Sequence, residues 1–503
     1  MQNDPHAWLR SMLRDNAVFG SIGSTLGWDE QTQLPKAATD LRADQLAMVA
    51  KLSHERQTSP ALGDAIAAAE EAARGSDPHS DEAVVSREAR RDYDRATKLP
   101  ADLVEQLARA EVVGHHAWIE ARKNDDFAAF EPYLTKMLEL KRREAECVGY
   151  EGHVYNALLD DYEPNETKAG IEQVFGELKD ELVQIVGAIR DSGKLAPSDI
   201  LERHYPVDQQ DAFSRRAAAA VGFDFDAGRL DIAVHPFCTG LGPGDTRMTT
   251  RFVENDLGNS FFSTLHETGH AMYEQGLPKA DHFGNGLGDS VSLGIHESQS
   301  RMWENLVGRS DAFWEFFWPV AQETFPVPLE GVRMEDFLFA VNDVRPSFIR
   351  TESDEATYNL HILLRFELEQ ALLTGDLSPK DLPGAWDEKM DRYLGITPPK
   401  ASLGCLQDVH WSAGLIGYFP TYTLGNLHAS QMFEQANADL GDLNAMFARG
   451  EFAPLLGWLR DKIHSQGRRY GARELTKNIT GQDLSAQPLL RHLKAKAQRF
   501  YGV

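Results

Sequence analysis

Apolar residues recur at helical intervals through most of this chain, and this spacing constrains its fold more than any other feature. In the stretch that begins at Ala101, for example, Leu103 and Leu107 lie about one helical turn apart. Segments with the same periodicity begin at Arg42 and Lys168, and the pattern returns near the C-terminus. The sequence therefore predicts a mainly α-helical protein.

Residues 229–252 depart from this pattern. Their sequence, RLDIAVHPFCTGLGPGDTRMTTRF, is rich in Gly, Pro, Thr and β-branched residues, and polar side chains occupy every second position from Arg247 to Arg251. This alternation is typical of a strand. We expect a short hairpin or small sheet here, leading into the helix that follows.

The breaks between the helical segments are short. Polar, Pro- or Gly-bearing stretches fall near residues 75–79, 195–198, 276–288 and 377–383. None is long or biased enough to separate two domains, and no internal repeat is visible. We therefore expect residues 1–503 to form a single domain.

The charge and the cysteine content limit the partners and the compartment. The formal net charge of −26 argues against binding to nucleic acid and against docking on anionic membranes. Three cysteines without close pairs indicate reduced thiols rather than a disulfide framework. The N-terminal residues show no signal-peptide pattern, and no apolar run is long enough to span a membrane. These features predict a cytoplasmic protein without nucleic-acid or membrane partners.

The strongest chemical signal is FFSTLHETGHAMYEQG, residues 261–276, in which two histidines lie four positions apart. On a helix, residues with this spacing differ by about 40° and project from one face, so His266 and His270 can share a metal ion. Glu267 lies about 100° round from His266, where it can flank the metal without binding it. Zinc favours neutral imidazole and in catalytic sites leaves one position to water, whose proton Glu267 can accept.

The motif has only three fixed positions, and it also arises by chance in ordinary helices. Its neighbours FFSTL and AMY are apolar, so the histidines lie on a largely buried helix, where an unpaired polar pair is costly. Thr268 and Gly269 are small and are expected to leave room beside a metal. This context favours one Zn²⁺ per chain, with Co²⁺ or another divalent ion as the alternative.

A catalytic zinc site needs a third protein ligand. The short-range spacing that would supply a third histidine fails, because the required Gly and His are absent. Glu297 lies 27 positions after His270, in a helical stretch that follows a Gly-rich loop, and is the predicted third ligand. The alternative for Glu297 is an ion pair with Arg301, four residues later. We expect the neighbouring His296 to orient a ligand rather than to bind the metal.

The sequence resembles the carboxypeptidase Taq family of thermostable zinc metallocarboxypeptidases, and the resemblance rests on more than the metal motif. Further matching stretches are GWDEQTQLP from Gly27, HPF at 235–237, DTRMT at 245–249, HESQ at 296–299, IRTESD at 349–354, GCLQDVHW at 404–411 and the GYFPTYTLGN that follows. They occur in order and cover most of the chain. One departure is Ser353, which stands where the family usually has Ala.

The resemblance implies a nearly all-helical fold with a deep central active-site groove, usually assembled as a homodimer. It implies an enzyme that removes single residues, with broad preference, from peptides with a free C-terminus. Carried over to this sequence, the family's metal ligands are His266, His270 and Glu297, and its catalytic carboxylate is Glu267.

A carboxypeptidase must bind a free α-carboxylate, for which the planar fork of arginine is well suited. Arg247 and Arg350 are both candidates, and the sequence does not rank them. The structural alternative for Arg247 is an ion pair with Asp245. For Arg350 it is an ion pair with Asp354. His235 is expected either to contact the peptide or to form a local hydrogen bond.

Peptide hydrolysis passes through a tetrahedral oxyanion that hydrogen-bond donors stabilise. By analogy with related helical zinc peptidases, Tyr422 is the first choice for this donor and His410 the second, with Tyr418 as an alternative. The structural alternative for each tyrosine is a buried side chain whose hydroxyl only forms a hydrogen bond within the core. Gln407 and Asp408 are expected to orient His410.

The leading hypothesis is thus a cytoplasmic zinc metallocarboxypeptidase. One alternative is an oligopeptidase of the same helical class that cuts inside short peptides, which would not need an arginine for the terminal carboxylate. Another is a helical scaffold with a structural metal. Structural zinc sites usually close all four positions with Cys or His, and no cysteine lies near His266 in the sequence.

Overall fold

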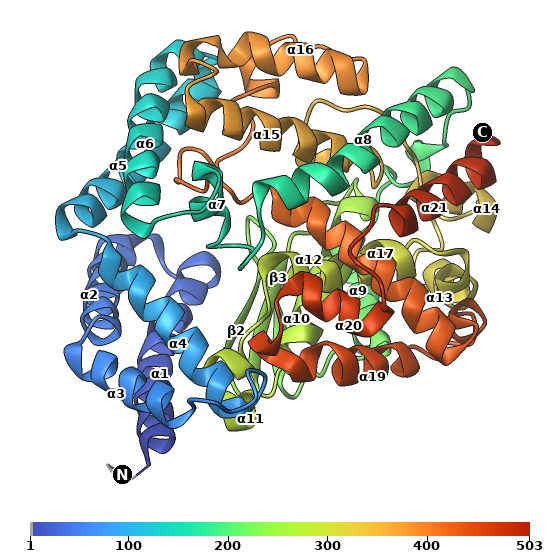
Figure 1. Cartoon of the computed structure of the whole chain (residues 1–503). Coiled ribbons are helices and arrows are strands. Elements are labelled where there is room, and N and C mark those ends of the chain that lie inside the picture. Colours follow the sequence, from blue (N-terminus) through green and yellow to red (C-terminus); the bar gives the residue numbers. More distant parts are fainter. Residues whose placement is uncertain (1–3) are drawn as a thin grey trace. The chain divides into compact units, whose positions relative to one another are not determined.

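The computed structural model describes residues 4–503, and within this range the chain forms 21 α-helices and a three-stranded sheet (Figure 1). The predicted mainly helical fold is confirmed. Contacts divide the chain into two compact units, each built from segments that are distant in sequence. Unit 1 is Met1–Thr97, Pro197–Val341 and Met432–Asp483, and unit 2 is Lys98–Ala196, Asn342–Gln431 and Leu484–Val503. The expected single domain stays a prediction.

Unit 1 carries the N-terminal helices and the helix that contains the histidine motif. Its helices are α1 (Pro5–Thr32), α2 (Thr39–Gln57), α3 (Pro60–Ala72), α4 (Asp81–Lys98), α9 (Val207–Val221), α10 (Leu257–Gly276), α11 (Lys279–His282), α12 (Leu293–Arg301), α13 (Asp311–Thr324), α14 (Met334–Val341), α18 (Leu443–Phe447), α19 (Ala453–Lys462) and α20 (Ala472–Thr480).

Unit 2 is built from helices of the middle and the C-terminal parts of the chain. They are α5 (Ala101–Asn124), α6 (Phe127–Val148), α7 (Val154–Leu159), α8 (Lys168–Asp191), α15 (Thr357–Thr374), α16 (Leu382–Leu394) and α21 (Gln487–Lys496). Helix α17 (Pro420–Leu440) begins in unit 2 and ends in the segment assigned to unit 1. None of the helices in residues 4–503 is both long and apolar enough to cross a membrane.

The predicted small sheet is confirmed, and it lies in unit 1. Its strands are β1 (Gly228–Ile232), β2 (Cys238–Gly242) and β3 (Asp245–Thr250), in the order β1-β3-β2. Strand β3 pairs parallel with β1 and antiparallel with β2. Both β2 and β3 pack against α10, so the sheet lies beside the motif helix.

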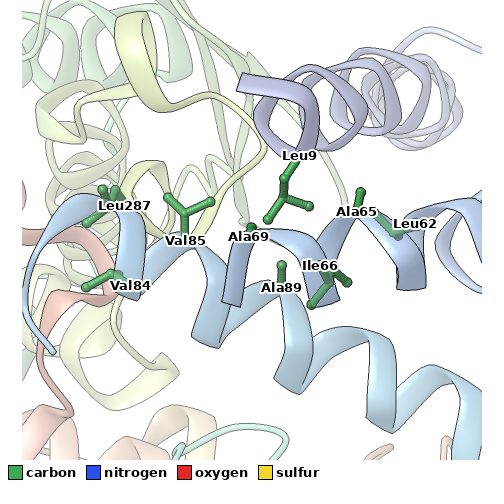
Figure 2. Packing of buried hydrophobic residues seen from close by; sticks show 9 residues of the cluster. All are labelled: Leu9, Leu62, Ala65, Ile66, Ala69, Val84, Val85, Ala89 and Leu287. Carbon is green, nitrogen blue, oxygen red and sulfur yellow. The ribbon is translucent and has the colours of Figure 1, made fainter. Parts of the chain in front are cut away.

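The N-terminal helices of unit 1 share an apolar core. Figure 2 shows Leu9 of α1 pointing toward side chains of α3 and α4. Small alanines in α3 and α4 allow the helices to approach closely, and the larger side chains fill the space that remains. The cluster consists of Leu9, Leu62, Ala65, Ile66, Ala69, Val84, Val85, Ala89 and Leu287.

Capping side chains set where the two helices of the candidate metal site begin. The carboxylate of Asp256 accepts a hydrogen bond from the backbone N–H of Asn259 at 2.9 Å, which starts α10. The hydroxyl of Ser292 accepts from the backbone N–H of Ile295 at 3.1 Å, which starts α12. Both caps satisfy backbone donors that the first helical turn leaves unpaired.

Gly269 sets how closely α10 and α12 pack. A Cβ atom added at Gly269 would lie 2.5 Å from the carbonyl oxygen of Gln299. Only glycine therefore allows this backbone-to-backbone approach. The expectation that Gly269 leaves room for a metal is wrong, because the backbone of α12 fills that space.

Candidate metal centre and active-site residues

The side chains of His266, His270 and Glu297 converge in unit 1. One ligand atom from each lies within 4.8 Å of the other two. Glu297 Oε2 is 3.7 Å from His266 Nε2 and 3.4 Å from His270 Nε2. Two imidazole nitrogens and one carboxylate oxygen are donor types also found in catalytic zinc sites, which keep one position for water. The three residues therefore fit a divalent metal ion such as zinc.

A carboxylate on the next helical segment holds the ring of His266. His266 Nδ1 lies 3.0 Å from Glu304 Oε2. Glu304 belongs to a π-helical stretch, Met302–Val307, that continues α12. Arg301 and Arg309 donate to its carboxylate at 3.3 and 3.4 Å. This contact occupies Nδ1 and turns Nε2 toward Glu297, as metal-binding histidines usually require.

A second imidazole holds the ring of His270. His270 Nδ1 faces His296 Nδ1 at 2.5 Å, and His296 Nε2 lies 2.8 Å from Glu274 Oε1. Lys279 forms an ion pair with the other carboxylate oxygen of Glu274. His296 therefore contacts a candidate ligand and lies outside the donor set of the three converging residues. This position agrees with the expected orienting role.

Glu297 takes part in both of the contacts that the sequence suggested as alternatives. Arg301 Nε donates to Oε1 at 2.7 Å, as the spacing of four residues indicates. Oε2 is the oxygen that faces the two histidines. The ion pair and the candidate metal position therefore use different oxygens of one buried carboxylate.

Glu267 lies on α10 directly after His266 and is buried, with 6% of its surface exposed. Burial raises the pKa of its carboxyl group to about 7. Within residues 4–503, no hydrogen bond involves its side chain. Both carboxylate oxygens are therefore available to a water molecule or a substrate.

Arg247 and His235 lie in and beside the small sheet of unit 1. Arg247 makes two hydrogen bonds to Asp245, at 2.9 and 2.8 Å, so the structural ion pair suggested by the sequence is present. Its guanidinium also lies 4.4 Å from the centre of the Trp28 ring. His235 is exposed, and its carbonyl oxygen accepts from Thr249 Oγ1 at 3.4 Å. Neither residue belongs to the converging metal-donor set.

Arg350 is buried in unit 2, where it forms an ion pair with Asp408. Its Nε lies 2.9 Å from Asp408 Oδ1, and its Nη1 donates to Tyr358 Oη at 2.9 Å. Arg365 donates to the other oxygen of Asp408 at 2.7 Å. The suggested pairing of Arg350 with Asp354 is wrong, because Asp354 instead accepts backbone N–H groups at the start of α15. Two guanidinium groups thus share one carboxylate.

Gln407 and Asp408 do not hold His410, which corrects the expectation from the sequence. Both oxygens of Asp408 accept from arginines, and Gln407 Oε1 accepts the backbone N–H of Arg350 at 2.8 Å. His410 Nε2 lies 3.2 Å from Tyr422 Oη. Its Nδ1 is buried without a hydrogen-bond partner among the described residues.

These surroundings decide the charge and the tautomer of His410. Burial and the nearby Arg350 lower the pKa of His410 to about 3, so the ring is neutral near pH 7. A buried N–H without an acceptor is rarer than a buried lone pair without a donor, so the hydrogen belongs on Nε2. Nε2–H then donates to Tyr422 Oη. The hydroxyl hydrogen of Tyr422 is left to bond to a different acceptor.

Tyr418 lies beside both of these residues in unit 2. The centre of its ring is 5.4 Å from that of His410 and 5.4 Å from that of Tyr422. The structure therefore brings together the three residues proposed from the sequence as oxyanion donors. The direct hydrogen bond joins His410 to Tyr422 rather than to Tyr418.

Several residues of these clusters were not found from the sequence, among them Glu274, Glu304 and Arg365. Helical spacing could have found two of them. Glu274 lies four positions after His270, and Glu304 lies seven positions after Glu297, so each shares a helix face with a candidate ligand. Arg365 carries no such signal, because its partner Asp408 lies 43 positions away.

The family model described as Carboxypeptidase Taq (M32) metallopeptidase matches residues 9–497. The donor set on a largely helical fold, together with the family match, indicates a metal-dependent peptidase. This chain belongs to that family.

Individual relatives agree over nearly full length. Thermostable carboxypeptidase 1 of Thermus thermophilus is 48% identical over 99% of this chain and 100% of the relative. Carboxypeptidase 1 of Bacillus subtilis is 38% identical over 97% of each chain. The crystal structure of the M32 carboxypeptidase from Deinococcus radiodurans R1 matches with a TM-score of 0.96, at 41% identity over 99% of this chain and 100% of the other. These relatives are named as carboxypeptidases, so the family to which this chain belongs is a family of carboxypeptidases.

Proposed function

We propose that this protein is a zinc carboxypeptidase that releases single amino acids, with broad preference, from peptides with a free C-terminus. The observation that carries the proposal is the convergence of His266, His270 and Glu297, with both Nε2 atoms turned toward Glu297 Oε2. Glu267 lies beside these donors on the same helix. The family match supports the reaction class.

We assign His266, His270 and Glu297 as the residues that hold the metal ion. Zinc bound there supplies Lewis-acid chemistry, which polarises a carbonyl group and makes water more acidic. Cobalt or manganese would serve in the same way. Glu267 accepts the proton of the attacking water and returns it to the nitrogen of the leaving amino acid. Its buried and unbonded carboxylate suits both transfers.

Tyr422 and His410 are proposed to stabilise the oxyanion. The contact with His410 Nε2 holds the phenol group of Tyr422 in place, and a phenol hydroxyl is a hydrogen-bond donor suited to a developing negative charge. Tyr418 packs against both rings and is proposed to line the same part of unit 2 and contact substrate.

Arg350 is the preferred residue for the terminal carboxylate, because its trio with Arg365 and Asp408 has two positive charges and one negative charge. An anionic group would balance the remaining positive charge of this buried cluster. Arg247 is the second candidate, although Asp245 already neutralises it one to one. His235 is exposed and is proposed to contact a more distant part of the peptide.

We propose that the protein forms a homodimer. Helix α2 contains no buried residue, and large apolar side chains of α1 and α2 are exposed. They are Val18, Ile22, Leu41, Met48 and Leu52. Exposed apolar surface of this kind is typical of an interaction site. Light scattering during gel filtration would show twice the chain mass, and a monomer mass would contradict the dimer.

We also propose that the protein works in the cytoplasm. Its three cysteines, Cys147, Cys238 and Cys405, are all unpaired. Free thiols persist in a reducing compartment. Fractionation of the native host would test this proposal.

A mass-spectrometric time course on a short peptide tests the reaction. Matched samples would contain zinc, a chelator, or zinc with a C-terminally amidated copy of the peptide. We expect a ladder that loses one residue at a time from the C-terminus and disappears with chelator or amidation. Internal fragments from both peptides would instead indicate the oligopeptidase, and no cleavage would indicate a structural metal. Peptides that differ in their last residue, and samples reloaded with cobalt or manganese, would test specificity and metal.

A further inference from the structure

Lys279 and Glu274 form a buried ion pair close to the candidate metal centre in unit 1. Glu274 lies on α10, four residues after His270, and Lys279 lies on α11. Their side chains are 15% and 10% exposed. Burying a lysine and a glutamate is costly, so a pair in this position calls for a reason.

The sheet also accommodates this pair. A Cβ atom added at Gly240 of β2 would lie 2.1 Å from Glu274 Oε2 and 2.5 Å from Lys279 Nζ. A larger residue at position 240 would therefore require the ends of these two side chains to shift. Strand β2 thus packs directly against the ion pair.

Glu274 begins a chain of contacts that reaches His270, and the first hydrogen bond has a forced direction. A carboxylate only accepts, so His296 Nε2, 2.8 Å from Glu274 Oε1, carries a hydrogen and donates it. His296 Nδ1 in turn lies against His270 Nδ1. This contact holds the ring of His270 with its other nitrogen, Nε2, facing Glu297.

We propose that Glu274, fixed by Lys279, is a positioning residue that acts through His296 to set the ring orientation of His270 for metal binding. The inference rests on the proposed role of His270 as a metal ligand. According to this proposal, the two histidines of the motif are held in different ways. Glu304 holds His266 directly, whereas a three-member relay of His296, Glu274 and Lys279 holds His270.

Zinc affinity of the metal-free chain tests the relay, measured by competition with a chromophoric chelator. Glu274→Leu removes the acceptor and should weaken zinc binding about 10- to 100-fold, the usual effect of losing a partner of a metal ligand. Glu274→Gln keeps an acceptor oxygen and should restore most of the affinity. Lys279→Met keeps the carboxylate of Glu274 but removes the ion pair that fixes it. The zinc affinity of this variant should lie between those of the two Glu274 variants.

Lys141→Met is the matched control, because Lys141 forms a similarly buried ion pair with Glu144 in α6. It should lower the thermal midpoint of the metal-free chain without changing zinc affinity. Wild-type affinity in both Glu274→Leu and Lys279→Met would overturn the proposal. An equal loss of affinity in Lys141→Met would overturn it too, because the effect would then follow stability alone. If the wild-type chain binds zinc but does not shorten peptides, the proposed function fails, and the affinities still decide the relay.

Discussion

Arg301 Nε lies 2.7 Å from Glu297 Oε1, and the other oxygen of Glu297, Oε2, faces His266 and His270. The ion pair therefore fixes the rotation of the carboxylate around its own axis. A structural contact and a proposed metal-binding role are combined in one buried side chain.

This relationship predicts the effect of Glu297→Gln. Arg301 can only donate, so it will hold the amide oxygen and turn the amide nitrogen toward the histidines. A nitrogen that carries two hydrogens cannot bind a metal, so zinc affinity should fall by at least about 100-fold, beyond the range for outer partners. Chelator competition measures the affinity. The control is Glu335→Gln, at an exposed glutamate of α14 in the same unit. Equal zinc affinities in the wild type, Glu297→Gln and Glu335→Gln would remove Glu297 from the ligand set.

The excess positive charge around Asp408 predicts that Arg350→Lys impairs the handling of a free C-terminus. Lysine keeps the charge but loses the planar fork that joins Asp408 and Tyr358. The loss of a charged hydrogen bond, about 1.5–3 kcal/mol, corresponds to roughly a 10- to 100-fold fall in kcat/KM. Arg247→Lys should have a smaller effect. Steady-state kinetics on one peptide would compare the two variants, and the opposite order would assign the carboxylate to Arg247.

The hydrogen bond between His410 and Tyr422 predicts a large effect of Tyr422→Phe on kcat and a small effect on KM. Loss of one donor to an oxyanion typically costs about 100- to 1,000-fold in kcat. Tyr418→Phe should have a milder effect, because phenylalanine keeps the packing of this ring against His410 and Tyr422. Pre-steady-state and steady-state assays would measure both variants. A wild-type kcat for Tyr422→Phe would leave this tyrosine a purely structural role.

Glu369, buried in unit 2, predicts how stability depends on pH. Burial raises the pKa of its carboxyl from 4.5 to about 7, against the opposing effect of hydrogen bonds from Tyr155 and Trp411. Between these two pH values the native chain binds the proton more strongly than the unfolded chain, so this group lowers stability as pH rises. The full penalty, at most about 3 kcal/mol, is present above pH 7.

Glu369→Gln should abolish this penalty, because the amide cannot ionise. The stability of the variant relative to wild type should therefore increase from pH 5 to pH 7.5. Denaturant midpoints of the two proteins at both pH values would measure the difference. A difference that does not change with pH would show that Glu369 does not titrate in this range.

Regular spacing along a helix made the convergence of His266, His270 and Glu297 predictable from the sequence. His266 and His270 share a face of α10 because four residues make about one turn, and Glu297 follows on the next helix after a loop long enough to return. The small sheet was visible for the same reason, since alternation reports a strand. These signals are local, and they describe one element at a time.

Contacts between elements had no comparable signal. Asp354 is the nearer candidate partner for Arg350 in the sequence, but its carboxylate accepts backbone N–H groups at the start of α15. The actual partner, Asp408, lies 58 positions away. The packing of α12 against Gly269 was also hidden, because a small residue beside a motif does not show what fills the space next to it. Tertiary packing decides both, and periodicity does not report it.

The most direct test of the account is the activity and metal content of Glu267→Gln. The substitution removes the proton acceptor and leaves His266, His270 and Glu297 in place. We predict the same zinc content and affinity as in wild type, with peptide shortening slowed by about 100- to 10,000-fold, the usual contribution of a general base. The exposed Glu254→Gln serves as control. Peptide shortening at the wild-type rate, with zinc bound, would contradict the central role given to Glu267.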